Sequence, residues 1–149
     1  ILSRVRESET LGRAGFFLRQ CALAKVSLEI HLRNPDGLDS SALFQEVYER
    51  VVGVPYNPEY HPVASFGHLT GYSAIYYTYL WSAVIARDLL TPFGAKGSLT
   101  DRATAERYAS EVLAPGGSRP AAELVRRFLG RESTFDAFQQ WVLAGTPPS

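Results

Sequence analysis

Apolar side chains recur every three or four residues along this chain, in segments separated by proline, glycine, asparagine and aspartate. This spacing is typical of helices that bury one face, and no segment alternates as a strand does. We therefore expect an all-α domain of about six to seven helices. The expected helices cover residues 1–8, 11–33, 40–52, 71–93, 101–113, 118–130 and 135–142, and residues 146–149 are expected to form a flexible tail.

Start and stop signals set several of these boundaries. Asn34-Pro35-Asp36-Gly37 is a turn sequence, and Asp39 or Ser40 can cap the helix that follows it. Gly53 is expected to end that helix in a left-handed conformation. Three prolines then make residues 54–66 a loop, because proline cannot continue a helix.

The segment from about residue 71 to 93 carries few polar residues on any side. A helix without a polar side is a buried one, so we expect this segment at the centre of the domain. On such a helix Tyr72, Tyr76 and Tyr79 would share one face within about 60° of arc. Tyr77 would lie on the opposite face and pack in the core.

The shared tyrosine face has two interpretations. One is an aromatic stripe buried in the core. The other is a wall of hydroxyl groups, which can donate hydrogen bonds to a carbonyl or oxyanion oxygen without carrying charge. His68 lies close by in sequence, beside Gly67 and Gly71, which adds a titratable ring to the same region.

Charge and cysteine content exclude several classes of function. The chain has 15 basic and 15 acidic residues and no long run of either sign, which argues against nucleic acid or an anionic membrane as partner. Arg87 and Asp88 interrupt its most apolar stretch, so we expect no membrane span. Cys21 is the single cysteine and is expected to be a small buried residue. Without an internal disulfide, the chain is expected in a reducing, cytoplasmic location.

Three longer motifs follow one another along the chain. They are Ala64–Leu69 continued by Gly71-Tyr72 and Tyr76–Ser82, then Val112–Ser118, then Arg127–Glu132. In their order and intervals, and together with Leu18-Arg19-Gln20, they resemble the C-terminal part of the thimet oligopeptidase, oligopeptidase A and dipeptidyl carboxypeptidase family of zinc metallopeptidases. The resemblance covers about Gly15 to Gly145.

The resemblance implies an all-helical peptidase with a deep channel that admits short peptides. Matched position by position, Tyr79 falls on the family's tyrosine that hydrogen-bonds the oxyanion. Tyr72 and Tyr76 fall on its substrate-contacting tyrosines. His68 falls on its substrate-binding histidine, and Gly71 belongs to the adjoining loop. This loop is one residue shorter here than in the family pattern.

The family's zinc motif is missing from this chain. The family binds zinc through His-Glu-x-x-His and a downstream glutamate, whereas His31, His61 and His68 are never three or four residues apart. We therefore expect residues 1–149 to be the C-terminal portion of a metallopeptidase, with zinc ligated outside this chain, and the isolated chain to be inactive. Its expected partners are the upstream portion and short peptides, and neither nucleic acid nor a membrane.

Two other classes of function stay open. The tyrosine face could hold peptides without cleaving them, or the chain could be a purely structural helical module. The sequence does not decide between an endopeptidase and a dipeptidyl carboxypeptidase, nor does it give the peptide preference.

Overall fold

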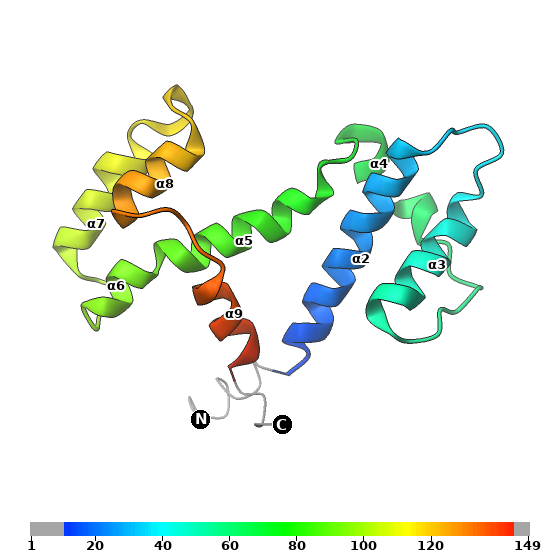
Figure 1. Ribbon diagram of the computed structural model, residues 1–149, viewed down its shortest axis with the longest axis horizontal. Coiled ribbons are helices and arrows are strands. Elements are labelled where there is room, and N and C mark those ends of the chain that lie inside the picture. The colour runs from blue at the N-terminus through cyan, green and yellow to red at the C-terminus, as the bar shows by residue number, and fades with distance from the viewer. Residues whose placement is uncertain (1–10, 145–149) are drawn as a thin grey trace. The chain divides into compact units, whose positions relative to one another are not determined.

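The computed structural model describes residues 11–144, which form helices and turns without a strand (Figure 1). The predicted all-α class is confirmed. The chain divides into two compact units, the first ending at Leu80 and the second covering Trp81–Ala144. The helix expected over residues 1–8 and the tail expected at 146–149 lie outside the described residues. In the described part of the chain, no helix is both long and apolar enough to cross a membrane.

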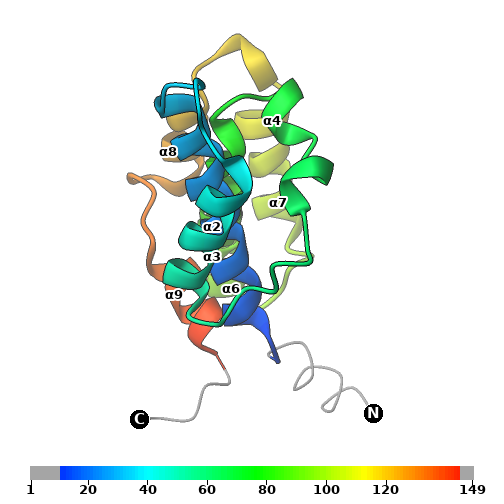
Figure 2. The same ribbon diagram turned by 90° about the vertical axis from the view of Figure 1, so that its right-hand side faces the viewer.

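Two helices, α2 (Arg13–Leu32) and α3 (Ser40–Val52), lie side by side in the first unit (Figures 1 and 2). The turn between them has Gly37 at a φ of 75°, a conformation that favours glycine. The carboxylate of Asp39 then accepts two backbone N–H bonds from the first turn of α3. Gly53 ends α3 at a φ of 77°. These boundaries agree with the sequence-based expectation.

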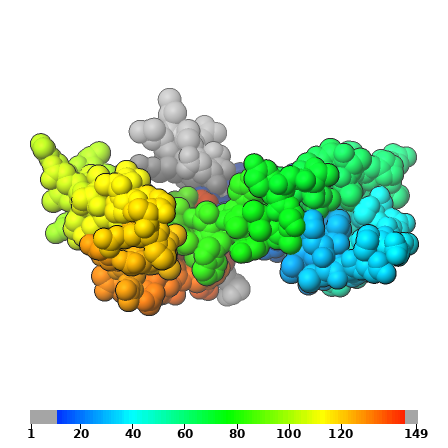
Figure 3. All heavy atoms as spheres, turned by 90° about the horizontal axis from the view of Figure 1, so that it is seen from above, coloured from blue at the N-terminus to red at the C-terminus, as the bar shows by residue number. Residues whose placement is uncertain are grey.

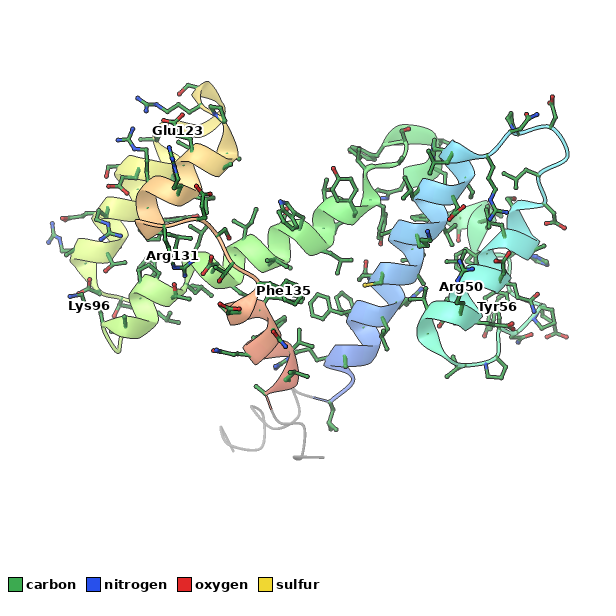
Figure 4. The ribbon with its side chains drawn as sticks, in the orientation of Figure 1. Arg50, Tyr56, Lys96, Glu123, Arg131 and Phe135 are labelled. Atoms are coloured by element: carbon green, nitrogen blue, oxygen red, sulfur yellow. The ribbon has the colours of Figure 1, made fainter. Side chains whose placement is uncertain are left out.

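The core of the first unit forms where α2 and α3 meet. Its buried side chains come from one stripe of each helix, as an amphipathic pattern requires: Val26, Leu43, Phe44 and Val47. The loop after α3 covers this core with Tyr56, whose ring centroid lies 5.5 Å from that of Phe44 (Figure 4). The Tyr56 hydroxyl donates to the Tyr60 carbonyl at 2.8 Å, which holds the proline-rich loop in place. A short 3-10 turn, Pro62–Ser65, ends this loop.

The segment expected as one helix over residues 71–93 is interrupted in the structure, so that prediction is wrong. Ser73 has a φ of 53°, which is incompatible with a right-handed helix. Pro92 ends the run a second time because it has no N–H to donate, and the Thr91 hydroxyl bonds the Asp88 carbonyl at 2.8 Å instead. The pieces are α4 (His68–Gly71), a 3-10 turn (Ile75–Tyr77), α5 (Thr78–Leu89) and α6 (Thr91–Ala95).

Burial of this segment also differs from the prediction. Tyr77 is 56% exposed and Trp81 is 61% exposed, so Tyr77 is not a core residue. In α5 the buried residues are Val84 and Asp88. Cys21, which was expected to be buried, is exposed on α2. These side chains lie on sides of their elements that the described residues leave uncovered, and an apolar composition alone does not reveal what covers a helix.

The second unit is built from short helices around Phe128, which is 1% exposed. The Tyr108 ring packs edge-on against it at a centroid distance of 5.3 Å. A π-helical turn continues α7 and packs against α8, as the yellow and orange atoms of Figure 3 show. The elements after α6 are α7 (Arg102–Tyr108), the π-helical turn Ala109–Leu113, a 3-10 turn (Gly116–Ser118), α8 (Ala121–Leu129) and α9 (Asp136–Leu143).

The buried residue of α7 is polar. Thr104 is buried, whereas its apolar neighbour Ala105 is exposed. A buried hydroxyl is costly only when it lacks a partner. The Thr104 hydroxyl donates to the carboxylate of Asp101 at 2.7 Å, and the Thr104 N–H bonds the same oxygen at 2.9 Å. The helix cap therefore makes this polar side chain suitable for the interior.

A fully buried carboxylate, that of Asp88, connects α5 to the segment between α8 and α9. Arg131, labelled in Figure 4, donates to both carboxylate oxygens, and the Ser133 hydroxyl and the Thr134 N–H donate to Oδ2 at 2.9 and 2.8 Å. Hydrogen bonds from Arg131, Thr134 and Ser133 hold the pKa of Asp88 below its ordinary value and outweigh the opposing effect of burial. Arg131, part of one of the family-like motifs, thus has a structural role.

Candidate functional site

His68 opens the short helix α4, directly after Gly67. Its backbone carbonyl accepts the N–H of Tyr72 at 2.9 Å, and the carbonyl of Gly67 accepts the N–H of Gly71 at 3.2 Å. This single helical turn fixes the backbone distance between the histidine and the first tyrosine. Because these residues fold into a complete turn, Tyr72 lies beside His68.

Three tyrosine rings surround the imidazole of His68, and we call these four residues, His68, Tyr72, Tyr76 and Tyr79, the tyrosine cluster. Tyr72 stacks on it with ring centroids 5.0 Å apart and planes inclined by 29°. Tyr76 and Tyr79 approach it edge-on at 5.0 and 5.4 Å. The Nε2 atom of His68 lies 2.9 Å from the hydroxyl oxygen of Tyr79, a hydrogen-bond distance.

The cluster does not form in the way the spacing suggests. Tyr72 ends α4, Tyr76 belongs to a 3-10 turn and Tyr79 lies in the first turn of α5. These three residues therefore do not share one helix face. They meet through a turn at Ser73, which has a φ of 53° and in which the Ile75 N–H lies 3.4 Å from the Tyr72 carbonyl oxygen.

Helix α2 supports the cluster from behind with two hydrogen bonds. The Tyr76 hydroxyl donates to Oε1 of Gln20 at 2.9 Å. The hydroxyl of Ser27, which is fully buried, donates to the carbonyl of Ser73 at 2.9 Å. Neither residue was singled out as a site residue from the sequence. A signal was present for Gln20, which lies in the family-like Leu18-Arg19-Gln20 segment.

Electrostatics keeps the phenol of Tyr76 protonated. Burial raises its pKa above the ordinary value of 10.0, the nearby Tyr79 raises it further, and Arg19 acts in the opposite direction. Tyr76 therefore stays a neutral hydroxyl at physiological pH. Its edge-on contact with Phe66, at 5.1 Å between centroids, makes the inner side of the cluster apolar.

Two side chains of the cluster are exposed, Tyr72 at 61% and Tyr79 at 55%. The tautomer of His68 decides what Tyr79 can do. If Nε2 carries the proton, His68 donates to the Tyr79 oxygen, and the phenolic proton is free for another acceptor. If Nδ1 carries it, Tyr79 donates to His68 instead. With Nε2 protonated, the pair presents a neutral, oriented donor to an oxygen atom.

A hollow of about 560 Å³ lies elsewhere in the first unit and is lined by other residues. Its walls are largely aromatic and proline side chains of the loop after α3, including Tyr56, Tyr60 and Pro62, with Arg19 of α2 at one side. Among the residues 11–144, no three His, Cys, Asp or Glu side chains lie close enough together to hold a metal ion. The donor set of a zinc site is therefore not formed by the described residues.

Comparison with known proteins gives a consistent result. The model of a family described as "Peptidase family M3" matches residues 1–142. The chain is 40% identical over 133 residues to a mitochondrial intermediate peptidase of Aspergillus clavatus, which covers 85% of this chain and 17% of that protein. It is 35% identical over 143 residues to a thimet-like oligopeptidase of Dictyostelium discoideum, and 30% identical over 142 residues to oligopeptidase A of Escherichia coli. These matches cover 93% and 92% of this chain and 21% of each relative, so the chain spans about a fifth of their length.

Proposed function

Because the chain belongs to peptidase family M3, we propose that it is part of a zinc-dependent oligopeptidase and supplies the tyrosine cluster to the wall of its substrate cleft. The relatives it matches carry the words peptidase or oligopeptidase in their names. The observation that carries the proposal is the 2.9 Å contact between His68 Nε2 and the hydroxyl of Tyr79, a side chain that is 55% exposed. The cytoplasmic location stays a prediction.

Each residue of the cluster has a distinct task in this proposal. Tyr79 donates a hydrogen bond from its phenolic hydroxyl to the oxygen of the scissile carbonyl, where negative charge develops in the transition state. His68 accepts no proton in this step, since its Nε2–H orients the Tyr79 oxygen. Tyr72, stacked on His68 and exposed, contacts the bound peptide. Tyr76 uses its own proton to bond Gln20, so it shapes the apolar floor and keeps lone pairs for a peptide N–H.

Zinc is the cofactor that the family resemblance implies, and the described residues of this chain do not form a site for it. We propose that residues outside this chain ligate the metal, which would activate the attacking water. The part of the chemistry assigned to this chain is binding the peptide and stabilising its carbonyl oxygen. The upstream portion that carries the zinc motif and short peptides are accordingly the proposed partners.

We expect the complete enzyme, meaning this chain together with the zinc-carrying portion, to hydrolyse short fluorogenic peptides. A chelator should abolish turnover and added zinc should restore it, because the activated water is lost and regained. This 149-residue chain alone should retain no stoichiometric zinc after dialysis and should cleave no peptide. Metal analysis and a fluorescence assay test both statements.

Three results would count against the proposal. One tightly bound zinc ion on the isolated chain would show that it holds a metal site of its own. Peptide binding by the complete enzyme without hydrolysis, at saturating zinc, would favour the non-catalytic binding module. Cleavage that persists at full strength in the chelator would show that the reaction does not need zinc.

The proposed partner portion also explains the exposed apolar side chains of α2. Phe16, Leu18, Leu28 and Leu32 are 57%, 43%, 41% and 72% exposed along this single helix. Leu18, Leu28 and Leu32 share one side of the helix, and Phe16 lies on the other. We expect the isolated chain to self-associate as its concentration rises, because several large apolar side chains on one side of a helix are rarely left uncovered in soluble monomers. Sedimentation over a range of concentrations measures this.

Charged replacement of Leu28 and Leu32, which are one helical turn apart, should reduce the association. The same replacement of Leu99, an exposed leucine outside α2, is the matched control and should leave the association unchanged. A chain that stays monomeric at all concentrations and melts cooperatively would contradict the expectation and indicate an independent domain.

A further inference from the structure

The Ser27 hydroxyl forms a long-range contact that a helical serine does not ordinarily make. Serine inside a helix usually points to solvent or bonds the carbonyl one turn earlier. Ser27 is fully buried, and its hydroxyl leaves the helix to reach the carbonyl of Ser73, 46 residues further along the chain. Alanine would fill the same space without a polar group to satisfy. The hydroxyl is therefore placed for this one contact.

The residue that Ser27 contacts holds an unfavourable backbone conformation. Ser73 has a φ of 53°, and it is the one residue other than glycine with a positive φ in the described part of the chain. A side chain disfavours this region, so neighbouring contacts must hold such a residue in place. Its side chain is exposed, and its carbonyl accepts the Ser27 hydroxyl, which joins the backbone of this turn to α2.

The Ser73 turn decides where the cluster tyrosines point. It separates Tyr72, which stacks on His68, from Tyr76, which bonds Gln20 on α2. Gln20 and Ser27 are seven residues apart, so they lie on the same face of α2, two turns from each other. This face of α2 thus contacts residues 73–76 at two points: Ser27 bonds the backbone carbonyl of Ser73, and Gln20 bonds the side chain of Tyr76.

We infer that Ser27 is a positioning residue: by fixing the left-handed turn at Ser73 to α2, it sets the stacking of Tyr72 on His68 and the approach of the cluster to substrate. The inference rests on the proposed function and goes further by assigning a role to a residue that touches neither the peptide nor the reacting atoms. It also predicts that the contact becomes less important when residue 73 prefers the left-handed conformation by itself.

The test uses Ser27→Ala in the complete, zinc-loaded enzyme. We expect kcat/KM to fall about ten- to a hundredfold, because a small misplacement of substrate-contacting groups has effects of this size. Ser110→Ala is the matched control, since its hydroxyl also donates to a backbone carbonyl, that of Arg107 at 3.1 Å, and it should be silent. In a Ser73→Gly background, Ser27→Ala should cost no more than about threefold, because glycine adopts the turn without help.

A second measurement does not depend on activity. Stacking on Tyr72 shifts the ring-proton resonances of His68, which are assigned by their disappearance in His68→Gln. We expect Ser27→Ala to move these resonances towards those of an unstacked histidine, while those of exposed His61 stay in place.

The outcomes separate the two proposals. If Tyr79→Phe lowers turnover but Ser27→Ala changes neither kcat/KM nor the His68 resonances, the inference about Ser27 is wrong and the proposed function stands. If Ser27→Ala costs the same factor with serine and with glycine at position 73, the turn is not what Ser27 holds, and the inference is again wrong. If the enzyme cleaves no peptide, the proposed function fails, and the His68 resonances still decide the role of Ser27.

Discussion

Replacing Tyr79 by phenylalanine is expected to lower the turnover of the complete enzyme on the order of a hundred- to a thousandfold, equivalent to about 3–4 kcal/mol of transition-state stabilisation. The change removes one hydroxyl and keeps the ring that packs on His68 and Tyr76. KM should move far less than kcat, because the bond to the oxygen strengthens as charge develops on it. Steady-state kinetics on a short fluorogenic peptide measures both.

Stability should barely change in Tyr79→Phe. Tyr79 is 55% exposed, and its hydrogen bond with His68 lies at the surface, where water can replace it. A fall in kcat without a fall in melting temperature would therefore point to the chemical step. An equal fall in both would point to a packing role and contradict the assignment of Tyr79.

Tyr77→Phe is the matched control for this experiment. Tyr77 and Tyr79 are almost equally exposed, at 56% and 55%, and the substitution removes the same atom. The difference is the partner, since the Tyr79 hydroxyl lies 2.9 Å from His68 and Tyr77 takes no part in the cluster. Turnover of Tyr79→Phe within a few-fold of both the parent and Tyr77→Phe would make the proposed donor role wrong.

Sequence patterns predicted the elements whose limits are set locally. Asp39 caps α3 through hydrogen bonds to residues two and three positions away, and Gly53 and Gly130 end their helices in the left-handed conformation. Such signals need only neighbouring residues, so one sequence contains all of the relevant information. The helix predicted over residues 11–33 spans Arg13–Leu32, so its start lies two residues and its end one residue inside the predicted limits.

The two breaks in the central segment differ in how far the sequence shows them. Pro92 is a local signal for the second break, which the predicted helix 71–93 passed over. The first break lies at Ser73, whose carbonyl accepts a hydrogen bond from Ser27, 46 residues earlier, and an apolar stretch gives no sign of this contact. The expectation that Tyr77 is buried was wrong for a different reason. An apolar surface indicates that something covers it, but not whether the cover belongs to the same chain.

The candidate site was predicted in its members but not in its geometry. The spacing and the resemblance pointed to His68, Tyr72, Tyr76 and Tyr79, and the structure brings these four together through a turn and not through one helix face. Their roles in catalysis and substrate binding stay predictions. Ser27 was missed because its hydrogen bond joins it to a residue 46 positions away. Gln20, which bonds Tyr76, was missed although it lies in the family-like Leu18-Arg19-Gln20 segment.

Replacing Asp88 by asparagine is expected to lower the free energy of unfolding by about 2–3 kcal/mol. Removing one partner of a fully buried ion pair typically costs about 3–5 kcal/mol, and the Arg131 side chain, at 43% exposure, recovers part of this by turning to water. Asparagine keeps the shape but replaces an oxygen acceptor by an NH₂ donor, which then faces donors from Arg131, Ser133 or Thr134. Urea unfolding followed by tryptophan fluorescence reports this unit, because Trp81 and Trp141 both belong to it.

The pH dependence gives this prediction its sharpest form. The contacts with Arg131, Thr134 and Ser133 lower the pKa of Asp88 in the folded state below its ordinary value of 3.8. The stabilisation is therefore complete above that value and is lost as the pH falls through the lower, folded-state pKa. The difference in free energy of unfolding between the parent and Asp88→Asn should be full at pH 7 and should shrink below about pH 4.

Arg126→Gln is the control for this experiment. It removes an exposed arginine whose Nε lies 3.9 Å from Oε1 of Glu132, and it should cost little stability at any pH. A difference between the parent and Asp88→Asn that stays constant from pH 7 down to pH 3 would show that the loss comes from packing and not from the charge of Asp88.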